Sequence, residues 1–218
     1  MIIISMLLTT NKNMKKILLI LCLCLFTQAC STTKNAEVIY SRSDIKTEVS
    51  AVIVFPTITP NIEINDSTKL VSGIISSKWT GVYGKKAIPA DPIMAELLKN
   101  KTSREYLGKL VSALDSTSGI EQILKDANIQ KFVQELTSKL GAAGNTRLAL
   151  SIMYGDEKSY NSGAPLYINV GLFDVKGLTW KVITKTESVK GKLGNFKLDA
   201  AGIASEHFAS ITTNLEEK

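Results

Sequence analysis

The chain has 218 residues, of which 44% are hydrophobic and 21% charged, and its formal net charge is +6 at pH 7. Lys12, Lys15 and Lys16 precede the cleavage site predicted below, so the remaining chain carries about +3. A charge this small gives no case for nucleic-acid binding. The same cleavage leaves one cysteine, which excludes an internal disulfide and a cysteine-rich metal site.

The N-terminal segment has the pattern of an export signal. Two lysines follow Met14, the apolar run Ile17–Phe26 comes next, and small or polar residues then lead to Cys30. A helix that crosses a bilayer needs about 20 apolar residues, and this run is half as long. We therefore expect a cleaved signal peptide over residues 1–29, with the true start at Met14.

The end of this signal resembles the lipobox of bacterial lipoproteins, in which a small residue precedes a cysteine that is linked to diacylglycerol. Ala29 takes the small position and Cys30 the lipidated one, while Thr27 stands where an aliphatic residue is usual. The resemblance implies that Cys30 carries the lipid and holds the chain in a membrane. An ordinary secretory signal and a membrane-embedded segment are the alternatives.

The residue after the cysteine indicates to which membrane a lipoprotein is sorted. Ser31 is not the Asp that retains lipoproteins at the inner membrane of enteric bacteria, which implies the outer membrane, on its periplasmic face. Residues 30–50 are polar and are expected to form a lipidated tether of up to roughly 65 Å, at 3.3 Å per residue. Residues 51–218 are expected to form a single periplasmic domain.

The first half of this domain is predicted to be mainly helical. A short apolar run ended by Pro56 indicates a buried strand, and an apolar stripe that extends to Trp79 indicates a helix. The expected elements are, in order, a strand over 51–55, a helix capped by Asp66 or Ser67, a strand over 86–90, a helix capped by Asp91, and helices over 102–140 with a break near Gly119.

From Asn145 onward the apolar period changes from 3.6 to 2. Strands are expected over 146–154, 165–175 and 178–188, with a tight turn at Lys176–Gly177, and a helix over 198–215. The predicted fold class is α/β, with helices packed against a mixed sheet that ends in an antiparallel three-strand meander and a C-terminal helix.

Two stretches carry a resemblance to known envelope proteins: "IPADPIMAELL" from Ile88 and "NVGLFDVKGLTWK" from Asn169. With the element order they resemble the fold of the amino-terminal domain of TolB, the curli secretion lipoprotein, the outer-membrane activators of peptidoglycan synthases, and lipoproteins auxiliary to ABC-type transporters. Asp174, Gly177 and Trp180 match at positions that serve a hairpin, so the resemblance implies fold more than function.

Residues suited to chemistry are few. His207 is the only histidine and borders an apolar helical stripe, which indicates a core or boundary position. The S-x-x-K matches at Ser31 and Ser43 lie in the tether, and the pair Asp156 and Glu157 lies in a loop. We therefore expect no catalytic residues, no metal, no cofactor and no enzymatic activity.

Four aromatic residues are candidates for contact with a partner. Trp79 and Tyr83 lie among three lysines, and Tyr154 and Tyr160 lie around a polar loop between two strands. Such side chains suit recognition of a partner. The alternative is that Trp79 and Tyr83 close the core while the lysines face water, and that the loop is an ordinary connection.

The sequence thus favours a lipid-anchored periplasmic accessory protein that docks on an envelope machine for transport, secretion or peptidoglycan synthesis. The alternative is a structural subunit that self-assembles into a homo-oligomer in an outer-membrane secretion complex. A membrane contact through the N-terminal lipid belongs to both hypotheses.

Overall fold

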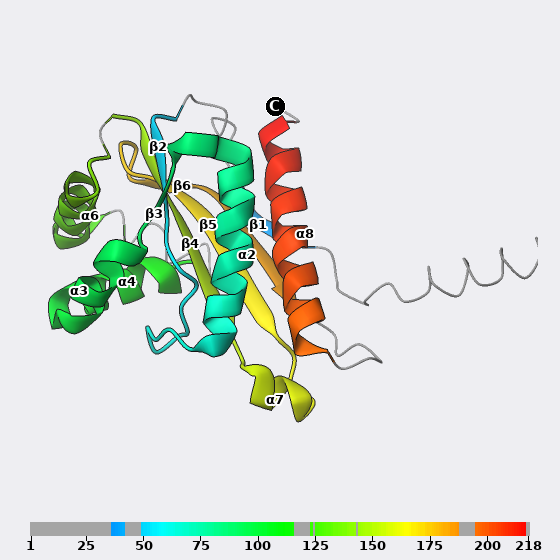
Figure 1. Cartoon of the computed structure of the whole chain (residues 1–218). Helices are drawn as coiled ribbons and strands as arrows, with labels where there is room; N and C mark the ends of the chain where they lie inside the picture. The colour runs from blue at the N-terminus through cyan, green and yellow to red at the C-terminus, as the bar shows by residue number, and fades with distance from the viewer. Residues whose placement is uncertain are drawn as a thin grey trace, which may run out of the picture. The chain divides into compact units, whose positions relative to one another are not determined.

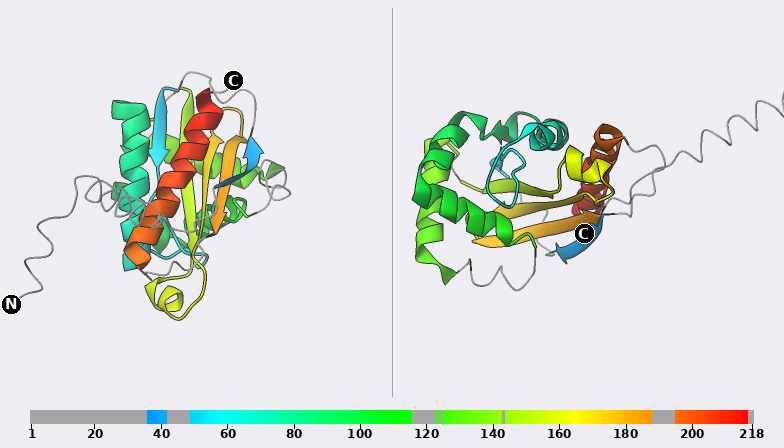
Figure 2. Two further views of the ribbon diagram at one scale, coloured as in Figure 1. Left: turned by 90° about the vertical axis from the view of Figure 1, so that its right-hand side faces the viewer. Right: turned by 90° about the horizontal axis from the view of Figure 1, so that it is seen from below.

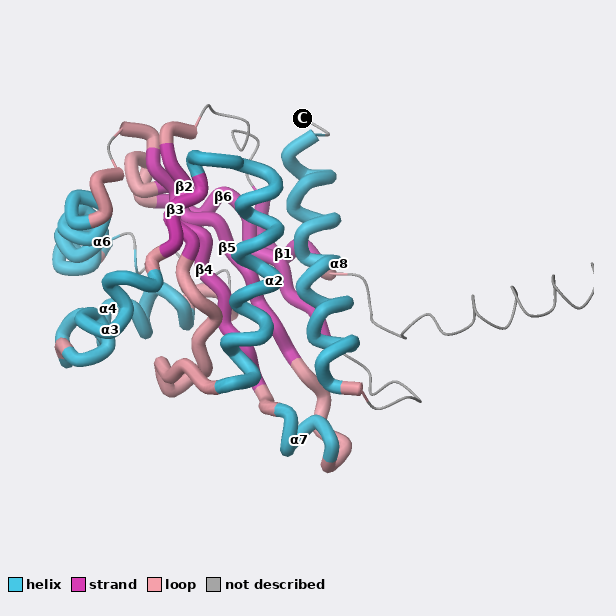
Figure 3. Tube along the Cα trace, viewed as in Figure 1, coloured by secondary structure: helices cyan, strands magenta, loops and turns pink. Residues whose placement is uncertain are grey.

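The computed structural model describes residues 36–41, 49–115, 123, 125–142, 144–187 and 195–216. Cys30, the predicted signal peptide and the break expected near Gly119 lie outside these residues. Helices and strands combine into a layered structure with a sheet at its centre (Figures 1 and 3). The predicted α/β class, with helices against a mixed sheet, is confirmed.

Six strands form one sheet in the order β1-β6-β5-β4-β2-β3. β4, β5 and β6 make the predicted antiparallel meander, β2 runs parallel to β4 and β3, and β1 runs antiparallel to β6. The strands are β1 (Glu37–Ser41), β2 (Ala51–Val54), β3 (Ala87–Pro89), β4 (Thr146–Tyr154), β5 (Tyr167–Asp174) and β6 (Thr179–Glu187). All four residues of β2 are buried, as expected of a central strand covered on both faces.

Helices cover both faces of the sheet (Figure 2). The described helices are α2 (Asp66–Tyr83), the 3-10 turn η2 (Gly84–Lys86), α3 (Asp91–Lys99), α4 (Lys101–Ser112), α6 (Ala127–Lys139), α7 (Glu157–Asn161) and α8 (Phe196–Glu216). The apolar period identified α2, α3, α4, α6 and α8, although α2 continues past Trp79 to Tyr83. It missed η2 and α7, because the residues of α7 were expected to form a loop. Asn65 caps α2, Asp126 caps α6, and Asp91 is the first residue of α3.

One face of the sheet is covered by α2 and α8, which lie side by side. Val71, Ile75 and Trp79 of α2 and the apolar stripe of α8 pack on Val52, Val170 and Val182. The other face is covered by α3, α4 and α6, whose leucines and Phe132 pack on Leu148, Leu150 and Trp180. The two cores on opposite faces explain why the strands are apolar on both sides.

Strand β1 corrects the expected tether. Residues 30–50 were expected to be a polar linker, yet Glu37–Ser41 pair with β6 and form one edge of the sheet. The hydroxyl of Ser210 in α8 donates to the carbonyl of Ala36 at 3.1 Å and fixes the start of the strand. The folded part therefore begins before Ala51, where it was expected to start.

Candidate functional site

Two of the four predicted aromatic contact residues, Trp79 and Tyr160, are buried. Trp79 has no exposed surface; its ring stacks on Tyr83 with centroids 5.6 Å apart and meets the edge of Phe208 at 4.6 Å. Tyr83 is half-buried, and burial raises the pKa of its hydroxyl while the nearby Arg147 lowers it. The partner-binding prediction is wrong for Trp79, whose ring joins α2 to α8.

The two tyrosines near the α7 loop also have structural contacts. Tyr160 is 1% exposed and donates to the carboxylate of Asp199, which ties α7 to α8. Tyr154 is half-buried and donates to the carboxylate of Asp115, three residues after α4 ends at Ser112. Burial and this carboxylate raise the pKa of Tyr154. The partner-binding prediction is therefore wrong for Tyr160, and it stays a prediction for Tyr154 and Tyr83.

The titratable residues that the sequence singled out are engaged in the fold. His207 is wholly buried and its Nδ1 lies 2.7 Å from Oγ1 of Thr184, so its core position is confirmed. Asp156 accepts a hydrogen bond from the backbone of Ser159 at 2.7 Å and caps α7. Among the described residues there is no group of three His, Cys, Asp or Glu that could hold a metal, and no helix is long and apolar enough to cross a membrane.

The topology of the parallel strands points to a different site. The chain leaves β2 through α2, which covers one face of the sheet, and leaves β3 through α3, α4 and α6, which cover the other face. Adjacent parallel strands whose connections diverge in this way leave a crevice outside their carboxyl ends. In α/β proteins ligands bind preferentially at such a crevice.

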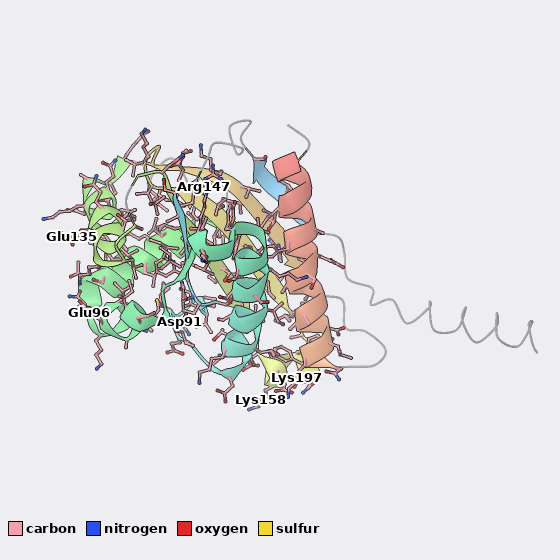
Figure 4. All side chains as sticks on the ribbon, turned by 45° about the horizontal axis from the view of Figure 1, so that its top comes forward. Asp91, Glu96, Glu135, Arg147, Lys158 and Lys197 are labelled. Atoms are coloured by element: carbon pink, nitrogen blue, oxygen red, sulfur yellow. The ribbon has the colours of Figure 1, made fainter. Side chains whose placement is uncertain are left out.

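A groove of about 470 Å³ lies at this position. Its floor is apolar and consists of the end of β2 and the residues that follow. Small polar side chains of α2 form one wall, and the start of α3 forms another. The groove is lined by Val54, Phe55, Pro56, Ile64, Lys69, Ser72, Gly73, Ser76 and Asp91; Figure 4 labels Asp91 where α3 begins.

The wall formed by α2 is held at its first turn. Asn65 and Thr68 form a reciprocal capping box, so the start of this helix is fixed. Ser72 accepts a hydrogen bond from the backbone N–H of Thr57 at 2.7 Å and donates to the carbonyl of Thr68 at 2.7 Å. These bonds join the wall to the segment that leaves β2.

Gly73 keeps the groove open at its middle. A Cβ added at Gly73 would meet no heavy atom within 4 Å. Lys69, Ser72 or Gly73, and Ser76 recur at helical spacing, so they share one face of α2. The glycine therefore adds no side chain to this wall, above a floor whose residues Val54 and Phe55 are 4% and 3% exposed.

The loop between β2 and α2 contains backbone strain. Ile62 has φ of 59°, a conformation that β-branched residues rarely adopt. Its neighbour Asn61 accepts a 2.8 Å hydrogen bond from Arg104 of α4, and the side chain of Ile62 lies close to Gly108. Since residues in such conformations cluster at ligand clamps and active sites, this loop is consistent with a binding role for the adjacent groove.

The charges of the groove are balanced. Lys69 on one wall is exposed and forms a 3.1 Å surface ion pair with Asp66, while Asp91 on the other wall is exposed at the first turn of α3. An apolar floor between one ammonium and one carboxylate selects neither anions nor cations. Sequence reasoning missed this site, because its residues come from three segments that only the topology brings together.

Comparison with known proteins finds structural similarity only. No family model matches the chain, and no curated protein matches it. Two crystal forms of the PelC dodecamer from Paraburkholderia phytofirmans are similar in structure. One, a variant, is 9% identical with a TM-score of 0.45 and covers 84% of this chain and 98% of that chain. The other is 8% identical with a TM-score of 0.41 and covers 85% and 96%.

Proposed function

We propose that this chain is a lipid-anchored accessory protein of the bacterial envelope, and that its domain docks on an envelope protein through the groove between α2 and α3. The anchor is Cys30, at the periplasmic face of the outer membrane. The groove at the carboxyl ends of β2 and β3, open at Gly73, is the observation that carries the docking role.

The proposed role is binding and not catalysis. His207 lies against Thr184 in the core, Asp156 caps a helix, and Tyr154 donates to Asp115. Each of these groups has a structural contact that accounts for its position. The groove itself offers two half-buried serines and two exposed charges, an arrangement suited to recognition.

The ligand we propose is an extended polypeptide segment of the partner. A polypeptide alternates apolar side chains with N–H and C=O groups, which matches an apolar floor bordered by hydroxyl groups. The opposite charges of Lys69 and Asp91 give no preference for a polyanion such as nucleic acid or for a polycation.

The test is crosslinking in cells that produce the full-length protein, followed by mass spectrometry of the complexes from detergent-solubilised outer membrane. Gly73→Trp fills the groove. Gly81→Trp is the matched control, because Gly81 lies on the same helix, is exposed and also has no atom near its Cβ position. We expect one heterologous envelope protein to crosslink to the wild type and to Gly81→Trp but not to Gly73→Trp.

A Cys30→Ala variant tests the anchor separately, and it should lose the membrane fraction and the crosslink together. Loss of the crosslink in both tryptophan variants, or in neither, would contradict docking at the groove. Crosslinks between copies of this chain alone would favour the alternative, a self-assembling structural subunit of an outer-membrane complex.

A further inference from the structure

The start of β1 lies at the same end of the sheet as the groove. The strand registers form one row across the sheet, from Glu37 to Lys185, Asn169, Ile152 and then Ile58. Ile58 lies beyond Val54, the last residue of β2, and so on the side where the groove opens. β1 is antiparallel to β2, so the chain enters β1 at the end where β2 leaves the sheet.

The chain between the predicted anchor and this row is short. Five residues, 31–35, separate Cys30 from Ala36, and six Cα–Cα steps span at most roughly 22 Å. The expected tether to Ser50 would have been about three times as long. Because β1 lies in the middle of the expected tether, only the residues before it can act as a linker. Their length limits how far the groove end of the domain can lie from the lipid.

The opposite end of the sheet is farther from Glu37, where β1 begins. Six residue steps along β4 lead from Thr146, at the start of the strand, to Ile152, in the row of Glu37, which is a distance of about 20 Å. The hydrogen bond from Ser210 to Ala36 and the pairing with β6 hold β1 in place. The first described strand thus begins at the groove end of the sheet, and the rest of the sheet extends away from that end.

We infer that the end of the sheet that carries the groove faces the membrane in which Cys30 is anchored, so that the groove takes a polypeptide segment of a membrane protein close to the bilayer surface. This inference rests on the proposed lipidation of Cys30. A component deep in the periplasm would meet the other end of the sheet, where β5 turns into β6.

Two lysines mark the two ends within one meander. Lys158 lies in α7, between β4 and β5, and Lys176 lies in the turn between β5 and β6. Both are exposed. Figure 4 shows Lys158 and Lys197 together at one end of the molecule and Arg147, the second residue of β4, at the other. The length of β5 separates the two connections by about 25 Å.

The experiment compares Lys158→Cys with Lys176→Cys in the full-length protein, purified from membranes and reconstituted into vesicles of phosphatidylethanolamine and phosphatidylglycerol. Cys22 and Cys24 leave with the signal and Cys30 is blocked by lipid, so a maleimide dye labels the introduced thiol alone. Energy transfer to an acceptor dye on the lipid headgroups reports the distance to the bilayer. We expect higher transfer from position 158 than from position 176.

Equal transfer from both positions, or higher transfer from position 176, overturns the inference. A second variant, with a flexible Gly-Ser insertion after Ser31, should reduce the difference, because a longer linker lets the domain turn. An unchanged difference would contradict orientation by the linker. A chain whose mass shows no lipid on Cys30, and which does not float with vesicles, would overturn both this inference and the proposed anchor.

Discussion

His207 of α8 and Thr184 of β6 meet in the core, with Nδ1 of the imidazole 2.7 Å from Oγ1 of the hydroxyl. Thr184 also donates to the carbonyl of Val170 at 3.3 Å, so the contact continues into β5. His207 has no exposed surface. A neutral imidazole therefore joins the last helix to the sheet, and a proton on it would bring an unpaired charge into the core.

The stability of the protein should fall as the pH falls below about 6.5. Burial lowers the pKa of His207 to about 3, although the backbone of Ile168 raises it slightly. Above pH 6.5 the imidazole is neutral in both states, and below it only the unfolded chain takes up the proton. Unfolding in urea should show a loss of roughly 2 kcal/mol between pH 8 and pH 5.

The control for this prediction is His207→Gln, which does not titrate. Because His207 is the only histidine, the variant should be less stable at pH 8 but nearly independent of pH between 5 and 8. A wild type whose urea midpoint is constant over this range would show that the imidazole is accessible to protons in the folded state.

Gly171 in β5 should not tolerate a larger residue. A Cβ at this position would lie 2.3 Å from Cδ2 of Leu114 and 2.6 Å from Cζ3 of Trp180. Overpacking of this kind costs about 1–3 kcal/mol, so Gly171→Ala should lower the urea midpoint. In the double variant with Leu114→Ala the two effects should be less than additive, since the second change makes room for the first.

The carboxylate of Asp174 serves both the β5–β6 turn and a buried ion pair. Oδ1 accepts from the backbone N–H groups of Lys176 at 2.9 Å and Gly177 at 3.1 Å, and Oδ2 lies 3.0 Å from Nζ of Lys181. Asp174→Asn can keep the turn bonds but leaves the Lys181 charge without this partner. Breaking a buried pair costs about 3–5 kcal/mol, so a large fall in the free energy of unfolding is expected.

The charge on Lys181 can be removed to test this reason. Lys181→Met keeps much of the apolar stem, and the double variant with Asp174→Asn should be more stable than Asp174→Asn alone. If the single variant Asp174→Asn and the double variant were equally unstable, the carboxylate of Asp174 would stabilise the protein through the turn and not through the ion pair.

The sequence predicted the meander and the helices α2, α3, α4, α6 and α8, because their apolar periods are strong and local. It missed β1, since "EVIYS" lies among polar residues and pairs with β6, which is far along the chain. The sequence identified four aromatic residues of interest, but not whether their side chains face the core or the solvent. Trp79 and Tyr160 are buried because α8 packs against them, and this tertiary contact is not visible in the local sequence.

The groove could not be predicted from local patterns. Val54, Ser72 and Asp91 come from a strand, the following helix and the helix after the next strand. They meet because the two connections cross the sheet on opposite faces. The turn after Asp174 was predictable, because Asp-Val-Lys-Gly between two apolar strands is a local signal, although the turn spans residues 175–178 and not Lys176–Gly177 alone.

Gly73→Ala and Gly81→Ala should each stabilise the protein. Gly73 lies in the middle of α2 and Gly81 in its last turn, and neither Cβ would meet an atom within 4 Å. Alanine restricts the unfolded chain and favours the helix, so each change should raise the free energy of unfolding by about 0.5–1 kcal/mol. Equal gains at the two positions would show that substitution at the groove does not disturb the fold.

Gly84→Ala provides the contrast, because it follows the same helix but has φ of 56°. An alanine there has open space around its Cβ and yet adopts a strained backbone, so this variant should lose stability where the other two gain it. If Gly73→Ala lost stability as Gly84→Ala does, the groove wall would depend on glycine for its conformation. In that case any loss of partner binding in Gly73→Trp could no longer be assigned to a filled groove.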